Sequence, residues 1–406
     1  MKKFLSLALV AAMLLSCMVL LGSCDTDGNE PAGDSDFKLG VICLHDEDST
    51  YDLNFINGVK EAQAALGLTD AQVIIKRNIP ESNECYEAAK DLVDEGCDVI
   101  FANSFGHETH ILKAAKEHPE VDFCHATGTM AHTENLANFH NAFASIYEGR
   151  YLAGVAAGLK LNQMITDGQI TADQAKMGYV GAFTYAEVIS GYTSFYLGAK
   201  SVCPSVTMDV QFTGSWYDEN AERNTANALI NGGCVLISQH ADSMGAPSAC
   251  EDKNIPNISY NGSTLEHCPD TFIVSSRINW APYFQYICTQ NMEGKAIDTD
   301  WTGTLSTNSV VLTDVNTAVA APGTVEEIAK VMEELKNGTR HVFDTKNFTV
   351  GGVALSSYMA DVNTDAAFEK DTEVIENGVF FESKHRSAPY FDIQIDGINL
   401  LNTNFG

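Results

Sequence analysis

The sequence has 406 residues, of which 54 are Asp or Glu and 24 are Lys or Arg, so its formal net charge is −30. This charge argues against nucleic acid and anionic membrane surfaces as partners. The length is sufficient for two domains of ordinary size.

The first 24 residues have the features of a bacterial lipoprotein leader. They begin with the positive "MKK", continue with the apolar run "FLSLALVAAMLLSCMVLL" and end in "LGSC". Small residues directly before a cysteine favour a signal peptide at 1–23 and lipidation at Cys24, on the extracytoplasmic face of the cell membrane. Three alternatives stay open. The leader can be a plain signal peptide without lipidation, Cys17 ends a competing motif, and the apolar run is nearly long enough to be a retained membrane anchor.

Residues 24–36 are polar, acidic and rich in Gly and Pro. Such a segment has little apolar surface to bury, so we expect a flexible tether. The folded part is expected to begin near Phe37, and no second apolar run of membrane-spanning length follows it in the sequence.

From residue 37 onward, strand-like and helix-like segments alternate. "FKLGVICL" predicts a strand, and residues 52–67 predict a helix that Gly67 ends, because their apolar residues recur at helical spacing. The same alternation predicts strands at 71–78, 97–104 and 121–128, and helices at 82–96 and 110–120. Short apolar strands between helices are typical of a parallel sheet covered on both faces.

The second half repeats this rhythm. Its predicted strands begin near 176, 207, 234 and 257, with spacings of 31, 27 and 23 that resemble the 34, 26 and 24 of the first half. "LVDEGCDVIFANSFG" also aligns with "LINGGCVLISQHADS" at an offset of 137 residues. The repeat predicts an α/β fold with two doubly wound parallel-sheet lobes.

The chain is expected to pass more than once between these lobes. A strand and helix predicted over 271–284 lies between them. We expect the N-terminal lobe to comprise 37–145 with part of about 280–345. The C-terminal lobe is expected to comprise 146–279 with part of about 346–406.

Eleven cysteines include two in the leader, and none of the other nine forms a CxxC pair. Several lie in strand-like runs, such as Cys43 in "GVICL" and Cys124 in "VDFCHA", which favours buried free thiols. A disulfide such as Cys250–Cys268 is the alternative, because sequence cannot establish connectivity.

Ligands of open parallel sheets bind beyond the carboxyl ends of the strands, and two such edges can face one another across a cleft. The loops at these edges are rich in aromatic residues, namely Tyr51, Phe105, Phe183, Trp216 and Tyr260, with Trp280 after the later strand. They also carry the polar residues Asp48, Asp52, Glu187, Asp218, Asp242, Asn261 and Asn279.

These residue types favour a neutral, planar ligand. Aromatic rings stack on planar solutes, and carboxylates accept hydrogen bonds from amino or hydroxyl groups. Arg277 is the exception in loops poor in Lys and Arg, which disfavours phosphate. A purine base or nucleoside fits, and a sugar fits less specifically. Each ring has a structural alternative, packing on its own lobe, and Asp52 and Asp218 can instead serve as charges at helix N-termini.

The sequence gives little support for an enzyme, because the catalytic and metal-binding motifs that we considered are missing or incomplete. "HETH" at 107–110 lacks the HExxH spacing that puts two metal ligands on one helical face. No GxSxG, P-loop or GxGxxG motif lies at a strand-to-helix turn. His240 and Asp242 suit acid–base chemistry, but no nucleophile is evident nearby. We therefore expect a protein that is not an enzyme and has no metal and no cofactor. A secreted hydrolase of nucleosides or sugars is the alternative.

Three segments resemble a known family: "NSFGHETHILKAAKEHPEVDFCHATG", "YEGRYLAGVAAG" and "ALINGGCVLISQHADS". They are similar to the basic membrane protein family of substrate-binding lipoproteins, which serve ABC importers. The similarity covers most of the chain after about residue 37. The resemblance implies a two-lobed, hinged type I periplasmic-binding-protein fold, and purine nucleosides or, in one branch, adenine as ligands.

The resemblance also assigns roles to individual residues. "DSTYDLN" places Tyr51, and "GSWYD" places Trp216, where the family stacks aromatic rings on either side of the purine. "YEGRYLAG" places Glu148 at an acidic position that binds the base or supports the hinge. A structural role at the start of a helix is its alternative.

The sequence departs from the nucleoside-binding members on the ribose side. Asn261 stands where those members carry Asp, and Asn279 lies nearest to where they carry Lys. This favours a purine base, with a nucleoside as a close second. The expected ligand-binding residues are Tyr51, Asp52, Phe105, Glu148, Phe183, Trp216, His240, Asp242, Asn261, Asn279 and Trp280.

The sequence therefore predicts a monomeric, lipid-anchored binding protein. Its lobes would close on a purine, bury the ring between Tyr51 and Trp216, and present the closed state to ABC permease subunits. A ligand-sensing receptor component with the same cleft is a further alternative.

Overall fold

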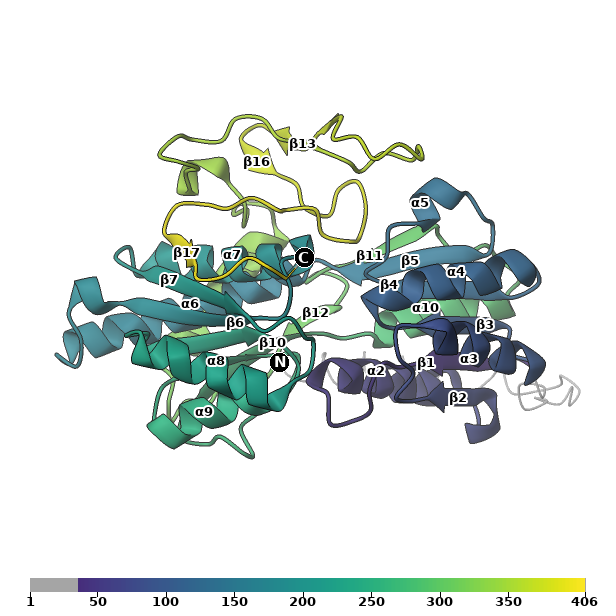
Figure 1. Ribbon diagram of the computed structural model, residues 1–406, viewed down its shortest axis with the longest axis horizontal. Helices are drawn as coiled ribbons and strands as arrows, with labels where there is room; N and C mark the ends of the chain where they lie inside the picture. Colours follow the sequence, from purple (N-terminus) through teal and green to yellow (C-terminus); the bar gives the residue numbers. More distant parts are fainter. Residues whose placement is uncertain (1–35, 406) are drawn as a thin grey trace, which may run out of the picture. The chain divides into compact units, whose positions relative to one another are not determined.

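The computed structural model describes residues 36–405, and Figure 1 shows their arrangement. The predicted signal peptide, Cys24 and nearly all of the predicted tether lie outside the described residues. The described chain forms two parallel-sheet lobes with helices on both faces, which confirms the expected fold class.

The first lobe is built on a six-stranded parallel sheet of order β11-β5-β4-β3-β1-β2. Its strands are β1 (Leu39–Ile42), β2 (Val73–Lys76), β3 (Val99–Ala102), β4 (Asp122–Ala126), β5 (Phe139–Ala144) and β11 (Asp300–Gly303). Its helices are α2 (Thr50–Leu66), α3 (Asn83–Asp94), α4 (Glu108–Glu117), α5 (Ala131–Glu134) and α10 (Ala281–Met292).

Alternate residues of β3 show how the helices cover both faces of this sheet. Val99 and Phe101 pack in the core that contains α2 and α10. Ile100 and Ala102 pack in a separate core with α3 and α4. Successive strand residues point to opposite faces, so a continuous apolar run is the pattern that a doubly covered strand requires. Gly67 ends α2 in the left-handed conformation, at φ 68°, as expected.

The second lobe contains the seven-stranded sheet β12-β10-β9-β8-β6-β7-β17, in which only the β10–β12 pair is antiparallel. Its strands are β6 (Lys176–Gly181), β7 (Thr207–Phe212), β8 (Leu236–His240), β9 (Asn257–Tyr260), β10 (Phe272–Ile278), β12 (Val310–Leu312) and β17 (Ile398–Leu400). Its helices are α6 (Ile146–Thr166), α7 (Ala186–Val202), α8 (Glu219–Asn231), α9 (Gly245–Lys253) and α11 (Thr324–Lys336).

Glycines bring α6 and α7 into direct backbone contact. A Cβ atom on Gly154 would lie 2.0 Å from the carbonyl oxygen of Phe195, and one on Gly198 would lie 2.0 Å from that of Tyr151. No larger residue fits at either position without separating the helices.

In the described chain, three connections join the two sheets: β5 to α6, β10 to α10, and β11 to β12. The strand and helix predicted over 271–284 are β10 and the start of α10, and they form the second of these connections.

Residues 341–405 form a long segment that contacts both lobes. It contains the two-residue strands β13 (Met359–Ala360), β14 (Thr372–Glu373), β15 (Ile375–Glu376) and β16 (Val379–Phe380), and it ends on β17 beside β7 (Figure 1). Ser387 donates hydrogen bonds from its backbone and hydroxyl group to the Asp300 carboxylate at the start of β11. On the second lobe, the Tyr192 hydroxyl of α7 donates to the side-chain oxygen of Gln394 at 3.3 Å.

All nine cysteines of the described chain are buried free thiols. This confirms the sequence interpretation, and the alternative Cys250–Cys268 bridge is wrong. Burial raises the pKa of the Cys268 thiol to about 11. At that pKa the sulfur stays protonated and unreactive at neutral pH.

Candidate ligand-binding site

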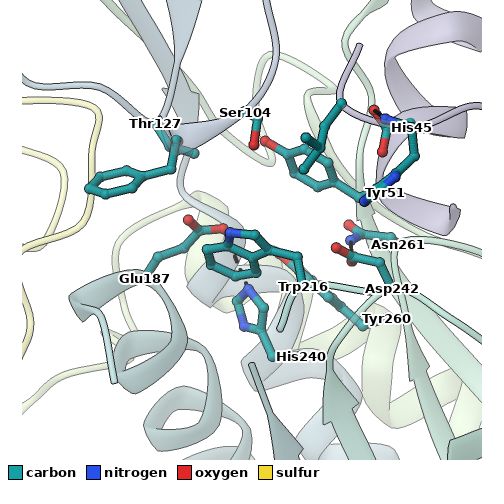
Figure 2. Close-up of a pocket in the computed structure, with 13 residues that line it drawn as sticks. His45, Tyr51, Ser104, Thr127, Glu187, Trp216, His240, Asp242, Tyr260 and Asn261 are labelled. Atoms are coloured by element: carbon teal, nitrogen blue, oxygen red, sulfur yellow. Dashed lines mark hydrogen bonds and ion pairs between the residues drawn. The ribbon is translucent and has the colours of Figure 1, made fainter. Parts of the chain in front are cut away.

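A pocket lies between the carboxyl ends of the two sheets, and Figure 2 shows its residues. It contains about 380 Å³ of space that no atom fills, part of it open to solvent. The first lobe lines it with Leu44, His45, Tyr51, Asp52, Ser104, Phe105 and Thr127. The second lobe lines it with Glu187, Trp216, His240, Asp242, Tyr260 and Asn261.

Tyr51 is fixed by the start of helix α2. The Ser49 hydroxyl caps this helix by accepting the Asp52 N–H at 3.2 Å, which sets the first turn. The Tyr51 hydroxyl donates to the carbonyl oxygen of Asn103 at 2.6 Å, and its ring meets the Phe55 ring edge-on at 4.9 Å. One face of the ring is left to the pocket, opposite Trp216 (Figure 2).

Trp216 is half-buried in front of two other rings. Its indole lies 5.0 Å from the ring of Phe183 and 6.1 Å from that of Tyr185, and those two rings stack at 5.1 Å. The Trp216 carbonyl accepts the N–H of Asp242 at 3.0 Å, which ties its loop to the loop after β8. Asp218 accepts the N–H of Ala221 at 2.9 Å and caps α8, so its structural alternative is the one observed.

The first-lobe carboxylate of the pocket belongs to Asp52. One oxygen accepts the Asn103 amide at 2.6 Å and the backbone N–H of His45 at 3.1 Å. The other oxygen is buried and has no hydrogen-bond partner among the described residues. A buried carboxylate oxygen without a partner is costly, so this atom is suited to accept a hydrogen bond from a ligand.

Asp242 faces the same space from the second lobe. Its carboxylate accepts the Asn261 amide at 3.1 Å. Burial, followed by the charges of Glu222 and Asp52, raises the pKa of Asp242 well above its usual value. Asp242 therefore holds a proton to higher pH than an exposed aspartate does and can donate as well as accept.

His240 lies beneath these groups as a neutral imidazole. Its ring is 4.4 Å from the Tyr260 ring, and its Nε2 is 3.4 Å from Oε1 of Glu187. Burial lowers the pKa of His240 by more than the neighbouring Glu187 raises it, and the positive charge of the buried Arg150 also lowers it. Arg150 is held by the hydroxyl of Ser238 at 2.7 Å, outside the pocket lining.

Two pocket residues have left-handed backbone conformations. Thr127 has φ 65° and Asn261 has φ 63°, and both sit at or just after the carboxyl ends of strands. This conformation is rare for a β-branched residue such as Thr127. Such strain concentrates at functional sites, where the surrounding structure maintains it.

Seven of the eleven expected ligand-binding residues line this pocket: Tyr51, Asp52, Phe105, Trp216, His240, Asp242 and Asn261. Phe183 lies behind Trp216. Trp280 is buried in the first lobe and stacks on Phe55 at 4.4 Å. The Asn279 amide group binds the carbonyl of Asn308 and the N–H of Ala281.

Glu148 also lies away from this pocket, at the start of α6. Its carboxylate accepts the N–H of Leu305 at 3.1 Å, and burial raises its pKa to about 7. Leu305 belongs to the connection between β11 and β12, so Glu148 is placed to support the region that joins the lobes.

Six lining residues were not in the expected set: Leu44, His45, Ser104, Thr127, Glu187 and Tyr260. Glu187 and Tyr260 stood among the loop residues after predicted strands. The signal that could have found Ser104 and Thr127 is position, because each closely follows a strand end.

Within residues 36–405, no group of three or more His, Cys, Asp or Glu side chains is arranged to hold a metal ion. No helix of the described chain combines the length and the apolar character needed to cross a membrane.

The chain matches a family model described as Bmp, ABC transporter substrate-binding protein PnrA-like, over residues 43–346. A solute-binding protein of an ABC transporter system from Aeropyrum pernix K1 superposes with a TM-score of 0.63, covering 75% of this chain and 92% of that chain. Their sequence identity is 15%, so this similarity concerns the fold alone.

Three curated relatives show similarity over parts of their length. A purine-binding protein of Brucella abortus is 32% identical over 55% of this chain and 60% of its own. A putative ABC transporter glucose-binding protein of Haloferax volcanii, TsgA13, is 34% identical over 46% of this chain and 44% of its own. The ABC transporter nucleoside-binding protein BmpA of Lactococcus lactis is 25% identical over 60% of this chain and 67% of its own.

The chain thus spans about half the length of the first two relatives. The family model, by contrast, covers about three quarters of the chain, including every sheet strand of the two lobes except β1 and β17 and all the residues that line the pocket. The chain belongs to the Bmp family of PnrA-like ABC transporter substrate-binding proteins.

Proposed function

We propose that this protein is the extracytoplasmic, lipid-anchored binding protein of an ABC importer, and that its ligand is a purine base or purine nucleoside. The observation that carries the proposal is the placement of Tyr51 and Trp216 on opposite sides of one pocket, each contributed by a different lobe (Figure 2).

Stacking is the interaction that these two rings support best. A planar heterocycle between them is in contact on both faces, and stacking of a base on an aromatic side chain contributes roughly 1–3 kcal/mol. Both rings are held from behind, Tyr51 by Asn103 and Phe55, and Trp216 by Phe183. Little side-chain freedom is then lost on binding, which favours affinity.

The polar lining supports a neutral ligand that donates hydrogen bonds. The pocket contains the carboxyl groups of Asp52, Glu187 and Asp242, and no Lys or Arg among residues 36–405 lines it. These groups can accept from amino and ring N–H groups of a purine. A phosphorylated nucleotide would bring negative charge next to them, so we expect nucleotides to be excluded.

A base is favoured over a nucleoside because two asparagine side chains expected near the ribose are already hydrogen-bonded to other groups of the protein. Asn279 lies outside the pocket, with both ends of its amide engaged by the protein. Asn261 lines the pocket, but its side chain is bound to Asp242. Neither residue replaces the charged groups that the resemblance associates with ribose recognition.

Sugar binding is the second candidate. The glucose-binding protein of Haloferax volcanii is 34% identical over the region that matches. Carboxylates and aromatic rings also bind sugars. Two rings on opposite faces of a narrow pocket, however, suit a flat ligand better than a puckered one.

The decisive experiment identifies and then titrates the ligand. Protein purified without added ligand is denatured, and the released small molecules are identified by mass spectrometry. Calorimetry then compares adenine, guanine, adenosine and glucose on ligand-free protein. We expect a 1:1 complex with adenine, weaker binding of adenosine and no binding of glucose.

Binding of glucose without binding of purines would overturn the proposal. Conversion of adenosine to base and sugar on incubation would instead support the hydrolase alternative. Loss of labelled-adenine uptake on deletion of the gene, with restoration by the wild-type gene, tests transport. Unchanged uptake would favour the sensing role, which uses the same pocket.

The anchor, the lobe limits and the oligomeric state belong to the same proposal. We propose lipidation at Cys24 after removal of residues 1–23 and a monomer in solution, with lobes bounded as the sequence predicts except that β12 and α11 belong to the second lobe. Cys24→Ala is expected to move the protein from the membrane fraction to the soluble fraction or to leave its leader uncleaved. Wild-type distribution and lipid labelling of that variant would exclude Cys24 as the lipidated residue.

A further inference from the structure

The family model ends at residue 346, and the chain beyond it adds an edge to the second sheet. β17 pairs in parallel with β7, in the register Ile398 to Met208 (Figure 1). No described strand covers the edge strand β2 of the first lobe in this way. The added edge therefore belongs only to the lobe that carries Trp216.

The pairing with β7 continues beyond β17. The backbone N–H of Leu401 donates to the Val210 carbonyl at 2.8 Å. The Asn402 side chain then accepts the Phe212 N–H at 2.8 Å and donates to the Phe212 carbonyl at 3.0 Å. The Asn402 side chain thus makes the two backbone hydrogen bonds that a neighbouring strand would make with Phe212, at the end of β7 and directly before the loop that holds Trp216.

Phe405 completes the contact. Its carbonyl accepts the N–H of Thr184 at 2.8 Å. Its ring fills the space over Gly214, where a Cβ atom would lie 2.6 Å from Cδ1 of Phe405. Gly214 has φ 78°, a conformation that glycine adopts most easily. Phe405 thus touches the two loops that build one wall of the pocket.

These two loops carry the ring cluster of that wall, which consists of Phe183, Tyr185 and Trp216. In the sequence, Thr184 lies between Phe183 and Tyr185, whose rings stack on each other, and Gly214 lies two residues before Trp216. Tyr185 also meets Phe105 of the first lobe, with ring centroids 5.2 Å apart. Movement of either loop would therefore shift Trp216 and this contact between the lobes.

From this geometry we propose that Phe405 is a positioning residue for ligand binding, which holds the ring cluster in place although it does not line the pocket. The proposal rests on the proposed function for its ligand. Without Phe405, the loops around Gly214 and Thr184 lose their support in the free protein. Binding must then order the rings, and ordering one or two side chains weakens affinity roughly three- to tenfold.

The test uses the full chain with Phe405→Ala, and Phe368→Ala as the matched control. Phe368 lies in the same long segment and is 93% exposed, so its removal disturbs no packing. Fluorine NMR on 5-fluorotryptophan-labelled protein follows the three tryptophans of the chain, with Trp216→Phe assigning one line. Calorimetry with adenine measures affinity well below the melting temperature.

We expect Phe405→Ala to shift or broaden the Trp216 line in ligand-free protein, to leave the Trp280 and Trp301 lines unchanged, and to weaken adenine binding about three- to tenfold. Phe368→Ala should change neither measurement. Phe405→Leu keeps an apolar side chain over Gly214, so it should restore the line and most of the affinity. A change in global stability would instead alter all three tryptophan lines of Phe405→Ala.

An unchanged Trp216 line in folded Phe405→Ala protein would overturn the proposal. If Phe405→Ala does not fold, a chain ending at residue 401 replaces it, and a wild-type Trp216 line in that folded chain would overturn the proposal equally. The NMR measurement needs no ligand. A protein that binds no purine but shows the shifted line would refute the proposed ligand and leave the positioning role intact.

Discussion

β2 of the first lobe and β7 of the second occupy the same place in the strand order, each next to the strand that begins its lobe. The loop after β2 carries Glu81, whose carboxylate accepts hydrogen bonds from the Ser104 hydroxyl at 2.6 Å and from the N–H of Gly106 at 2.7 Å. The loop after β7 carries Trp216, which lines the pocket itself.

Glu81 and Asp218 are separated by the same 137 residues that align the two halves in sequence. Glu81 braces the turn of Phe105, whereas Asp218 caps helix α8. A structural repeat thus fixes where a loop lies but not which chemistry it supplies. One lobe uses this loop to support a neighbouring loop, and the other uses it to supply a ring.

The largest expected difference between the lobes concerns helix packing. Gly154→Ala would place a methyl group 2.0 Å from the Phe195 carbonyl, against the backbone of α7. We expect a loss of about 3 kcal/mol or more in unfolding free energy, measured by urea denaturation. Gly58→Ala in the first lobe meets Trp280 at 2.8 Å and should cost less, about 1–2 kcal/mol. Equal losses of unfolding free energy in the two variants would contradict this difference in helix packing between the lobes.

The second lobe is expected to make stability depend on pH through Glu222, a buried residue of α8. Burial raises its pKa from 4.5 to about 7. Because the folded protein keeps this proton to higher pH than the unfolded chain does, the contribution of Glu222 to stability is full below about pH 4.5 and is lost as the pH rises to about 7. Glu222→Gln should therefore reduce the fall in unfolding free energy between pH 5 and pH 8 by about 2–3 kcal/mol.

Cys85 provides the control, because it lies 137 residues before Glu222, in α3 of the first lobe. A Cys85→Ala variant loses stability at every pH but should keep the wild-type pH dependence. A Glu222→Gln variant with an unchanged pH dependence would show that other groups, such as Asp242, cause the effect.

The two rings of the pocket can be removed one at a time. Trp216→Ala should weaken adenine binding by more than about tenfold, since it removes a stacking partner. Tyr51→Ala should have a similar effect from the other lobe. Trp216→Phe and Tyr51→Phe keep a ring and should retain most of the affinity. Calorimetry showing unchanged adenine affinity in Trp216→Ala would refute stacking between the lobes.

The smallest expected effects separate the roles of Glu81 and Asp218. Asp218→Ala removes a helix cap, so we expect a loss of about 1 kcal/mol in stability with adenine affinity nearly unchanged. Glu81→Ala frees the turn that holds Phe105, so it should weaken adenine binding about two- to fivefold. Thermal melts and calorimetry on both variants check this. The reverse pattern would show that the two loops have been assigned the wrong roles.

The sequence predicted four strands in each half from short strand-like runs at similar spacings, and with them the loops that follow. Tyr51, Trp216 and Asp242 were found in this way, because the carboxyl ends of parallel strands meet at one edge. Trp280 also lies after a strand, β10, so the same rule placed it among the expected ligand-binding residues. β10, however, leads into a connection between the lobes. The chain turns there, and the indole packs on Phe55 in the core.

Other elements depended on contacts that no local pattern encodes. β5 was not predicted, because "FHNAFA" mixes polar and apolar residues that are all buried. His140 of this strand reaches Asp122 at 3.5 Å, and Asn141 reaches Glu108 at 3.1 Å. The support of Trp216 by Phe405 joins residues nearly 200 positions apart, which sequence periodicity cannot reveal.

The hydrogen bonds between Ser387 and Asp300 add a non-covalent link to the three covalent connections between the lobes. A rotation that moves β11 away from the second lobe must break these bonds or pull Ser387 along, against the anchoring of Gln394 on α7. The measured affinity for a ligand then includes the work of straining or releasing this link. Substitutions at Ser387 can consequently change the affinity and the dissociation rate although the residue touches no part of the pocket.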